Sequence, residues 1–380
     1  MLISCRSSTE STDYFGQIHP DSKPQVFAPG IVSIKGRLEH GLSFSPDAQE
    51  FAFGILDKDN FRGAIYYSKK HNEGWTTPEV LEPLKGKSAY LPYFSPNGKF
   101  LLYTQSKSDT NFNYKDIWII KKKGKYWRHP EKLKIPLSEQ TSVSNACMSL
   151  NETVYFSSNI NCIGIENCFT ADLFYSELKN SQYQNTKEIT VLNSQFDEES
   201  IFIAPNESYM IFCRYSTNKI GPDLFVSYRN INGDWIQPTR LDSTINSPNW
   251  ERRPFVSNDN KFLFFTKLTF NMSGLQESDI YWVSTQGIFK PFVFNPIPEQ
   301  TIKVDKVTEI SIPSDYFKDI DNEKLEISIS EENIEWAKFD QKKMTLLLNP
   351  KELGNYELIV TAVDESSNKT EDTVKLIVEK

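Results

Sequence analysis

The sequence predicts an all-β protein with internal repeats, and two observations support this prediction. Phe, Tyr and Trp together make up 13% of the 380 residues, and aromatic and β-branched residues are enriched in strands. A short pattern also recurs along most of the chain, in which two apolar segments flank a tight turn of Pro, Asn, Asp or Gly. Its clearest copy is residues 91–103, Leu-Pro-Tyr-Phe-Ser-Pro-Asn-Gly-Lys-Phe-Leu-Leu-Tyr.

This pattern occurs five times between Arg37 and Phe294. Its first turn position recurs at intervals of 50, 54, 55 and 53 residues, at Pro46, Pro96, Leu150, Pro205 and Asn258. A period near fifty with several strands in each unit is typical of propeller blades. We therefore predict a five-bladed β-propeller over residues 21–294, with a six-bladed ring as the alternative.

Two segments compete for the outer strand of the last blade. Residues 24–27, Pro-Gln-Val-Phe, lie at the same distance from the next first strand as residues 78–81 do in the first unit. Residues 289–294 follow the third strand of the last unit and carry the aromatic residue and the Pro of an outer strand. The sequence leaves both assignments open.

Beyond Asn295 the composition changes and the repeated turns stop. Apolar and polar residues alternate over residues 356–363 and 373–378, which indicates half-buried strands. We predict a β-sandwich over residues 295–380.

The charge and hydropathy of the chain argue against nucleic acid as a partner and against a membrane-spanning helix. The formal net charge is −8, and the lysines do not gather into the basic face that nucleic acid binding needs. No apolar run of about 18 residues occurs, so we expect no membrane-spanning helix. Contact with a membrane is expected only through a lipid anchor.

Several of these segments resemble known families. The units, such as Leu42-Ser43-Phe44-Ser45-Pro46, resemble TolB-type, WD40-like propeller repeats, and residues 15–17 and 24–33 are similar to the lead-in of envelope-associated propeller proteins of Bacteroidetes-type bacteria. Residues 317–325 and 354–364 resemble a cadherin-like, dystroglycan-type Ig-like domain. The first resemblance implies an exported bacterial protein. The second implies calcium at an acidic cluster, for which Asp319, Asp321 and Asp364 are the candidates, with acidic turns that bind no metal as the alternative.

Residues 1–20 are predicted to form a tether. Met1-Leu2-Ile3-Ser4-Cys5 precedes a polar stretch and looks like the end of a bacterial lipoprotein signal, in which Cys5 would be lipidated. The basic and apolar regions of such a signal would have to lie upstream of Met1. The protein would then belong to the outer membrane or periplasm. The alternative is a cytosolic tail with an incidental cysteine. In an oxidising compartment Cys162 and Cys168 could form a disulfide.

One set of residues could bind a ligand. The residue just ahead of each first strand is expected to line the mouth of the central channel, where a sugar or a peptide end could bind. These residues could instead neutralise one another around trapped water. The five positions are His40, Tyr90, Ser144, Glu199 and Arg252, and their charged neighbours are Glu39, Glu198, Glu251 and Arg253.

Two functions from different classes fit these observations. The preferred hypothesis is a non-enzymatic envelope protein whose propeller binds a protein or a glycan, with no cofactor apart from calcium in the C-terminal domain. The alternative is a carbohydrate-active hydrolase with a carboxylate pair among Glu39, Glu198, Glu199 and Glu251. Such a pair would need to lie about 5 to 9.5 Å apart.

Overall fold

The computed structural model describes residues 14–107, 115–124, 126–166, 168, 170–216, 221–271, 274–321, 324–330 and 334–380. The chain is all-β and forms two compact units. The first unit holds the residues up to Ser227 together with Gln237–Ser284, and the second holds Tyr228–Ile236 and Thr285–Lys380. In the described ranges the only helices are single 3₁₀ turns, η1 Tyr14–Gly16, η2 Glu82–Leu84 and η3 Ile160–Cys162, and none could cross a membrane.

The first unit consists of four-stranded antiparallel arrays, five of them within the described residues. In chain order they are β2 Leu38–Phe44, β3 Glu50–Leu56, β4 Gly63–His71 and β6 Glu79–Val80; β7 Ala89–Phe94, β8 Phe100–Ser106, β9 Lys115–Lys123 and β11 Glu131–Lys132; β12 Val143–Met148, β13 Val154–Ser158, β14 Asp172–Ser176 and β17 Lys187–Glu188; β18 Glu198–Ile203, β19 Tyr209–Arg214, β20 Asp223–Tyr228 and β21 Thr239–Arg240; and β22 Trp250–Val256, β23 Phe262–Asn271, β24 Gly274–Ser284 and β1 Gln25–Val26. Short strands extend three hairpins: β5 Gly74–Trp75, β10 Tyr126–Trp127, and the pair β15 Leu178–Lys179 and β16 Gln182–Tyr183.

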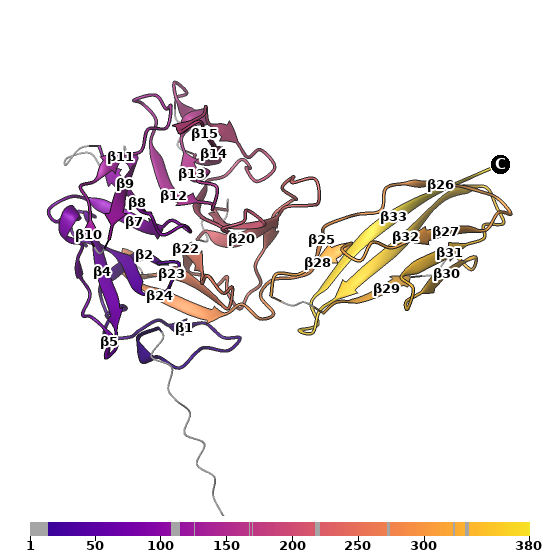
Figure 1. Cartoon of the computed structure of the whole chain (residues 1–380), viewed down its shortest axis with the longest axis horizontal. Helices are drawn as coiled ribbons and strands as arrows, with labels where there is room; N and C mark the ends of the chain where they lie inside the picture. The colour runs from indigo at the N-terminus through magenta and orange to yellow at the C-terminus, as the bar shows by residue number, and fades with distance from the viewer. Residues whose placement is uncertain are drawn as a thin grey trace, which may run out of the picture. The chain divides into compact units, whose positions relative to one another are not determined.

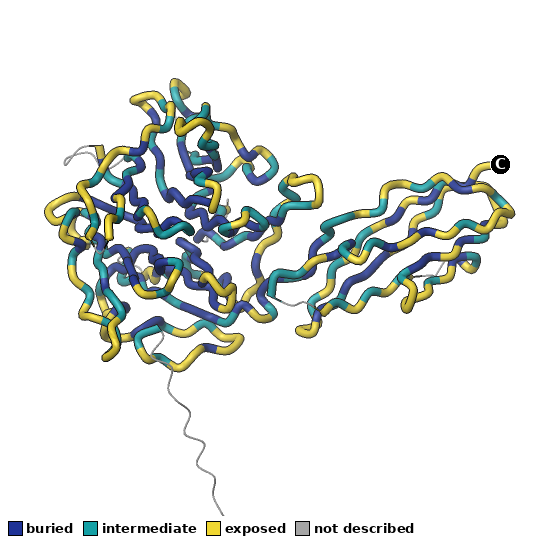
Figure 2. Tube along the Cα trace, in the orientation of Figure 1, coloured by how far each residue is buried: buried dark blue, intermediate teal, exposed yellow. Residues whose placement is uncertain are grey.

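The first strands of these arrays form a closed ring. Strand β2 contacts β7, β7 contacts β12, β12 contacts β18, β18 contacts β22, and β22 returns to β2. Figure 1 shows the arrays radiating from this ring, and Figure 2 shows that the inner strands are its most buried parts. This arrangement is a β-propeller, as the repeats predict.

The structure decides which segment completes the last blade. Strand β1 pairs antiparallel with β24, with Gln25 opposite Trp282 and Val26 opposite Tyr281. The backbone nitrogen of Phe27 extends this pairing by donating to the carbonyl of Ile280 at 2.7 Å. The competing assignment of residues 289–294 is wrong, because β25 Phe292–Val293 pairs with β28 Phe317–Lys318 inside the second unit. The ring is thus closed by the start of the described sequence.

Aromatic side chains hold this closing segment in place. Phe27 is fully buried and makes edge contacts with Phe51, Phe264 and Trp282, at ring-centroid distances of 5.8, 5.2 and 5.3 Å. Because these partners come from the first and last blades, burial of Phe27 joins the two ends of the ring.

The second unit is a β-sandwich. One sheet has the order β26-β33-β32-β29 and the other β27-β31-β30. Their bounds are β26 Gln300–Lys303, β27 Thr308–Ser311, β29 Glu326–Ser330, β30 Ala337–Asp340, β31 Thr345–Leu348, β32 Gly354–Val363 and β33 Lys369–Glu379. Both sheets contribute to one core. Leu358, Val360 and Ala362 are fully buried on β32, in agreement with the alternation seen in the sequence.

We expect Phe27→Ala to destabilise the first unit by about 3–5 kcal/mol, because it leaves a cavity at the ring closure. Urea unfolding of the full-length protein, followed by tryptophan fluorescence, measures the loss. The control is Ile18→Ala, since Ile18 is 82% exposed. A loss below about 1 kcal/mol for Phe27→Ala would show that the closure contributes little.

Candidate functional site

A β-bulge interrupts each first strand near its start. The pairing register shifts there in all five blades, for example between Glu39 and Leu42 and between Arg252 and Phe255. One residue of each bulge has a left-handed backbone: Gly41 (φ 72°), Leu91 (56°), Asn145 (52°), Ser200 (60°) and Arg253 (58°). Four of the five are not glycine, although this conformation is unfavourable for them. A bulge re-aims side chains, and here it does so at the same position in every blade.

The bulge residues meet around the axis of the ring. With its amide turned so that its oxygen faces Ser200, Asn145 accepts hydrogen bonds from the Ser200 nitrogen at 2.8 Å and from Arg253 Nη1 at 3.0 Å. Arg253 Nη1 also donates to Ser200 Oγ. A Cβ on Gly41 would lie 3.2 Å from Leu91 Cδ2 and 3.6 Å from Arg253 Cβ, so both space and backbone favour glycine there.

Three of the five predicted mouth residues gather beside Arg253. Glu199 Oε1 forms an ion pair with Arg252 Nη2, lies 3.7 Å from Arg253 Nη1, and accepts a hydrogen bond from the Tyr215 hydroxyl at 3.0 Å. His40 Nε2 lies 3.3 Å from Arg253 Nη2. We call His40, Glu199, Arg252, Arg253, Tyr215 and the neighbouring Lys115 the axial cluster.

The other two predicted mouth residues take different roles. The Tyr90 hydroxyl bonds to Ser88 Oγ at 2.7 Å and to the Phe61 carbonyl at 3.2 Å. Its ring faces the axial cluster, because Lys115 Nζ lies 5.8 Å from the ring centroid. The backbone carbonyl of Ser144 accepts a hydrogen bond from Ser157 Oγ at 3.2 Å.

The three flanking glutamates lie in the protein interior. Glu39, Glu198 and Glu251 are all fully buried, and each fastens the loop that leads into its own first strand. Glu198 accepts hydrogen bonds from the nitrogen and hydroxyl of Ser194, and Glu251 accepts the same pair from Ser247. Glu39 accepts from the Ile34 nitrogen and from Arg37 Nε. Burial raises the pKa of all three carboxyls, that of Glu39 to about 7. Three of the four carboxylates of the hydrolase hypothesis therefore have a structural role.

The axial cluster carries an excess of positive charge. Burial, together with Arg253 and Arg252, lowers the pKa of Lys115 to about 8 and holds the pKa of His40 well below its usual range. His40 is therefore neutral at pH 7. Burial and Arg253 also lower the pKa of Arg252, and Asp197 is the carboxylate among the described residues that opposes this shift.

Sequence reasoning missed several of these residues. Asn145, Ser200, Lys115, Tyr215 and Asp197 come together only when the bulges turn neighbouring strands toward one axis. The glycine at position 41 and the asparagine at position 145 are a weak signal, since both residue types tolerate a left-handed backbone. Nothing comparable marks Leu91 or Arg253.

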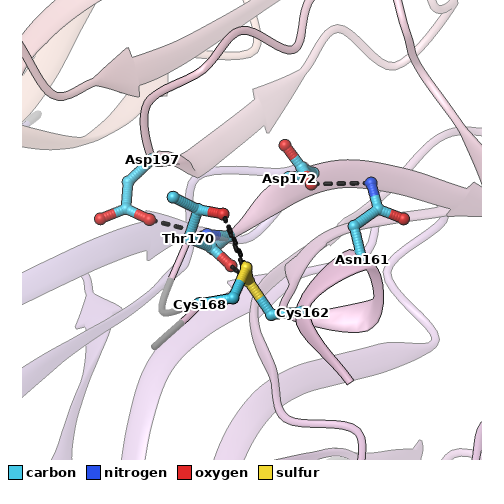
Figure 3. The surroundings of a disulfide bond; sticks show 7 residues. Asn161, Cys162, Cys168, Thr170, Asp172 and Asp197 are labelled. Carbon is cyan, nitrogen blue, oxygen red and sulfur yellow. Dashed lines mark hydrogen bonds between the residues drawn. A yellow bond between two sulfur atoms is a disulfide. The ribbon is translucent and has the colours of Figure 1, made fainter. Parts of the chain in front are cut away.

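A disulfide closes the loop between β13 and β14 of the third blade, at the end of the blade where the bulge lies. Cys162 and Cys168 are joined, and Figure 3 shows the surrounding contacts. Asn161 Nδ2 donates to Asp172 at 2.8 Å, and the Ala171 nitrogen donates to Asp197 Oδ1 at 2.7 Å. The cross-linked loop is thus tied to the start of the next first strand. Cys147 and Cys213 are free and buried, and Cys5 lies outside the described residues.

An open groove lies away from the axis. Its volume is about 1290 Å³, and residues of the first two blades line it, among them Tyr67, Glu82, Trp127, Arg128 and His129. The groove holds both charge signs, and its lining residues Tyr67 and Lys69 contact the buried Glu50.

Two acidic residues of the second unit, Asp319 and Asp321, form a buried pair in which the pKa of both carboxyls is raised. Burial and a hydrogen bond with Asp319 raise the pKa of Asp321 to about 8. Asp364 uses both carboxylate oxygens to accept bonds from Asn368. One oxygen on each of Asp319 and Asp321 has no hydrogen-bond partner, whereas calcium takes six to eight oxygens. Within the described ranges no group of three or more His, Cys, Asp or Glu residues could hold a metal ion.

The raised pKa of Asp321 predicts a pH dependence of stability. An unfolded aspartate titrates near 3.9, so between about pH 4 and pH 8 the folded protein holds the extra proton. The free energy of unfolding therefore falls as pH rises through that range. We expect Asp321→Asn to flatten this fall, as measured by calorimetry of the full-length protein in EDTA.

The matched control is Asp305→Asn, which changes an exposed aspartate of the same unit. Calcium that raises the wild-type melting temperature at pH 8, but not that of Asp321→Asn, would contradict a protonated Asp321 and favour a calcium site.

No family model and no curated protein sequence matches the chain. Solved structures resemble it in fold only. The endo-arabinase from Bacteroides thetaiotaomicron VPI-5482 has a TM-score of 0.41 and 9% identity, over 70% of this chain and 96% of that one. The catalytic domain of the Coprinopsis cinerea GH62 alpha-L-arabinofuranosidase has a TM-score of 0.43 and 7% identity, over 70% and 98%. A complex of BT0996 with RGII has a TM-score of 0.44 and 10% identity, over 70% and 92%.

Proposed function

We propose that this protein is a carbohydrate-binding protein of the bacterial cell envelope whose axial cluster holds the ligand without catalysing a reaction. The observation that carries the proposal is that the candidate carboxylates are already engaged in contacts within the protein. Glu39, Glu198 and Glu251 fasten loops inside their own blades, and Glu199 is neutralised by Arg252. A glycosidase needs one carboxyl as acid and another as base or nucleophile, and these four residues do not supply such a pair.

The remaining polar groups suit a ligand rich in hydroxyls. Arg252 and Lys115 can donate hydrogen bonds, and Glu199 can accept them. The side chains of Arg252 and Glu199 are 13% and 16% exposed, so their outer edges reach solvent while their bases are fixed. A sugar with neighbouring hydroxyls presents both donors and acceptors to such a surface.

A carbohydrate-active hydrolase is the second candidate. The endo-arabinase and the arabinofuranosidase named above are enzymes of this class, but a likeness at these TM-scores does not transfer an activity. The specific observation in favour is the closeness in sequence of Glu199 to Asp197, whose pKa is raised by burial. A carboxyl with a raised pKa is suited to act as a general acid.

A glycan array probed with the full-length protein tests both candidates. We expect binding that weakens about tenfold or more in Arg252→Gln, because a charge-assisted hydrogen bond is lost. Arg240→Gln is the matched control, since Arg240 pairs with Asp223 within the preceding blade. Absence of binding to any glycan would contradict the proposal. Hydrolysis of a bound glycan that Glu199→Gln abolishes without unfolding the protein would favour the second candidate.

The finer assignments also belong to this proposal. We assign the propeller to the TolB-type, WD40-like class on its repeats, and the sandwich to the cadherin-like or Ig-like class on the segments quoted above. The sandwich would act as a spacer or as a second contact with an envelope protein. Calcium binding at Asp319, Asp321 and Asp364 remains a prediction of the sequence.

We further propose that the protein is a lipoprotein anchored through Cys5. The disulfide between Cys162 and Cys168 supports an oxidising compartment. Mass spectrometry of protein expressed from the full genomic reading frame in a bacterial host should find a diacylglyceryl mass on the mature amino terminus. Cys5→Ser should abolish it and leave the protein in the soluble fraction. An unmodified Cys5 in the wild type would contradict the anchor.

A further inference from the structure

We infer that the axial cluster selects a sugar that carries a carboxylate, a uronic acid. This inference rests on the proposed carbohydrate binding and names the ligand class. Its basis is the set of charges that the bulges bring to the axis.

The described residues leave the positive charge of this cluster unbalanced. Three cations, Lys115, Arg252 and Arg253, face two carboxylates, Glu199 and Asp197. Glu199 is shared by both arginines. Lys115 has no carboxylate partner among the residues that the structure describes and instead lies over the Tyr90 ring. One negative charge from outside would complete the pairing.

The base of the cluster is already desolvated. Arg253 is 8% exposed, and the Nε atoms of both Arg252 and Arg253 are buried without a hydrogen-bond partner in the described part of the chain. Leaving a buried donor unpaired is costly, and crowding two guanidinium groups together adds to that cost. Such an arrangement is stabilised when an anion binds, so these groups favour an anion over a neutral molecule.

Glu199 and Asp197 restrict the kind of anion. These two protein carboxylates would repel the second negative charge of a bound phosphate. A ligand carboxylate carries a single negative charge, which the arginines and Lys115 can neutralise. Glu199 Oε1 accepts from Tyr215, and its remaining lone pairs can accept hydroxyl protons. A uronic acid offers its carboxylate to the cations and its hydroxyls to Glu199, so it uses both charge signs of the cluster.

The test compares an acidic sugar with its uncharged methyl ester. Calorimetric titration of the full-length protein uses trigalacturonic acid and the same trisaccharide with its carboxyls methyl-esterified. We expect the wild type to bind the acid about tenfold or more tightly, as a charge-assisted contact implies. Lys115→Gln should reduce this ratio toward one, because it weakens binding of the acid more than binding of the ester. The matched control is Lys132→Gln, because Lys132 pairs with Asp116 in the same blade and should keep the full ratio.

The outcomes separate the two proposals. Equal affinity for acid and ester in the wild type would overturn the selectivity and leave carbohydrate binding in place. No binding of either, with no other glycan bound on the array, would overturn both. Tighter binding of a tripeptide with a free carboxyl terminus than of trigalacturonic acid would indicate that the natural ligand is a peptide. It would overturn the proposal that the ligand is a sugar. If Lys115→Gln unfolds, Lys115→Arg, which keeps the charge, should retain the ratio; loss of the ratio in a folded Lys115→Arg would contradict a purely electrostatic role.

Discussion

The bulge at the start of each first strand is the constraint on which the rest of the site depends. A regular strand would alternate its side chains between the two faces of its own blade. The left-handed residue breaks that alternation, and in three of the blades the side chain of this residue contacts its counterpart in a neighbouring blade. Asn145, Ser200 and Arg253 are then linked by hydrogen bonds across three blades. These links stabilise backbone conformations that would each be unfavourable alone, so the strain and the axial contacts depend on each other.

The buried glutamates show how the same repeat uses charge for structure. In three blades the residue two positions before the bulge residue is a fully buried glutamate that accepts hydrogen bonds from the loop before it. The other two blades have Ala89 and Val143 at this position, both buried. A blade can therefore fill the site with an apolar side chain. The carboxylate serves to fix a loop, and a glutamate near a channel mouth is weak evidence for catalysis.

The sequence predicted the propeller better than it predicted the site. Repeated turns such as the one after Pro96 can be predicted because the residue types of a short segment determine where the backbone turns. The sandwich core followed from period-two alternation on β32, where Leu358 and Val360 are buried. The axial cluster is different, because its residues come from four blades and their convergence depends on the bulge. The pattern ahead of each turn singled out His40, Glu199 and Arg252, and in the structure these three residues lie beside Arg253 or its neighbour Glu199. It gave no sign that Glu198 points into the protein while Glu199, its neighbour, points to the axis.

An uncompensated charge in a folded core needs an explanation in terms of free energy. Desolvation lowers the pKa of both Lys115 and Arg252, because burial disfavours their charged forms. The cluster therefore reduces the stability of the protein without a ligand. The same desolvation strengthens any interaction that a bound anion makes, because charges attract more strongly where water is excluded. A purely structural site would gain by replacing these cations with apolar residues, as Ala89 and Val143 replace the glutamates elsewhere in the ring. This is the energetic character that the proposed binding site requires, in which stability of the free protein is given up for affinity.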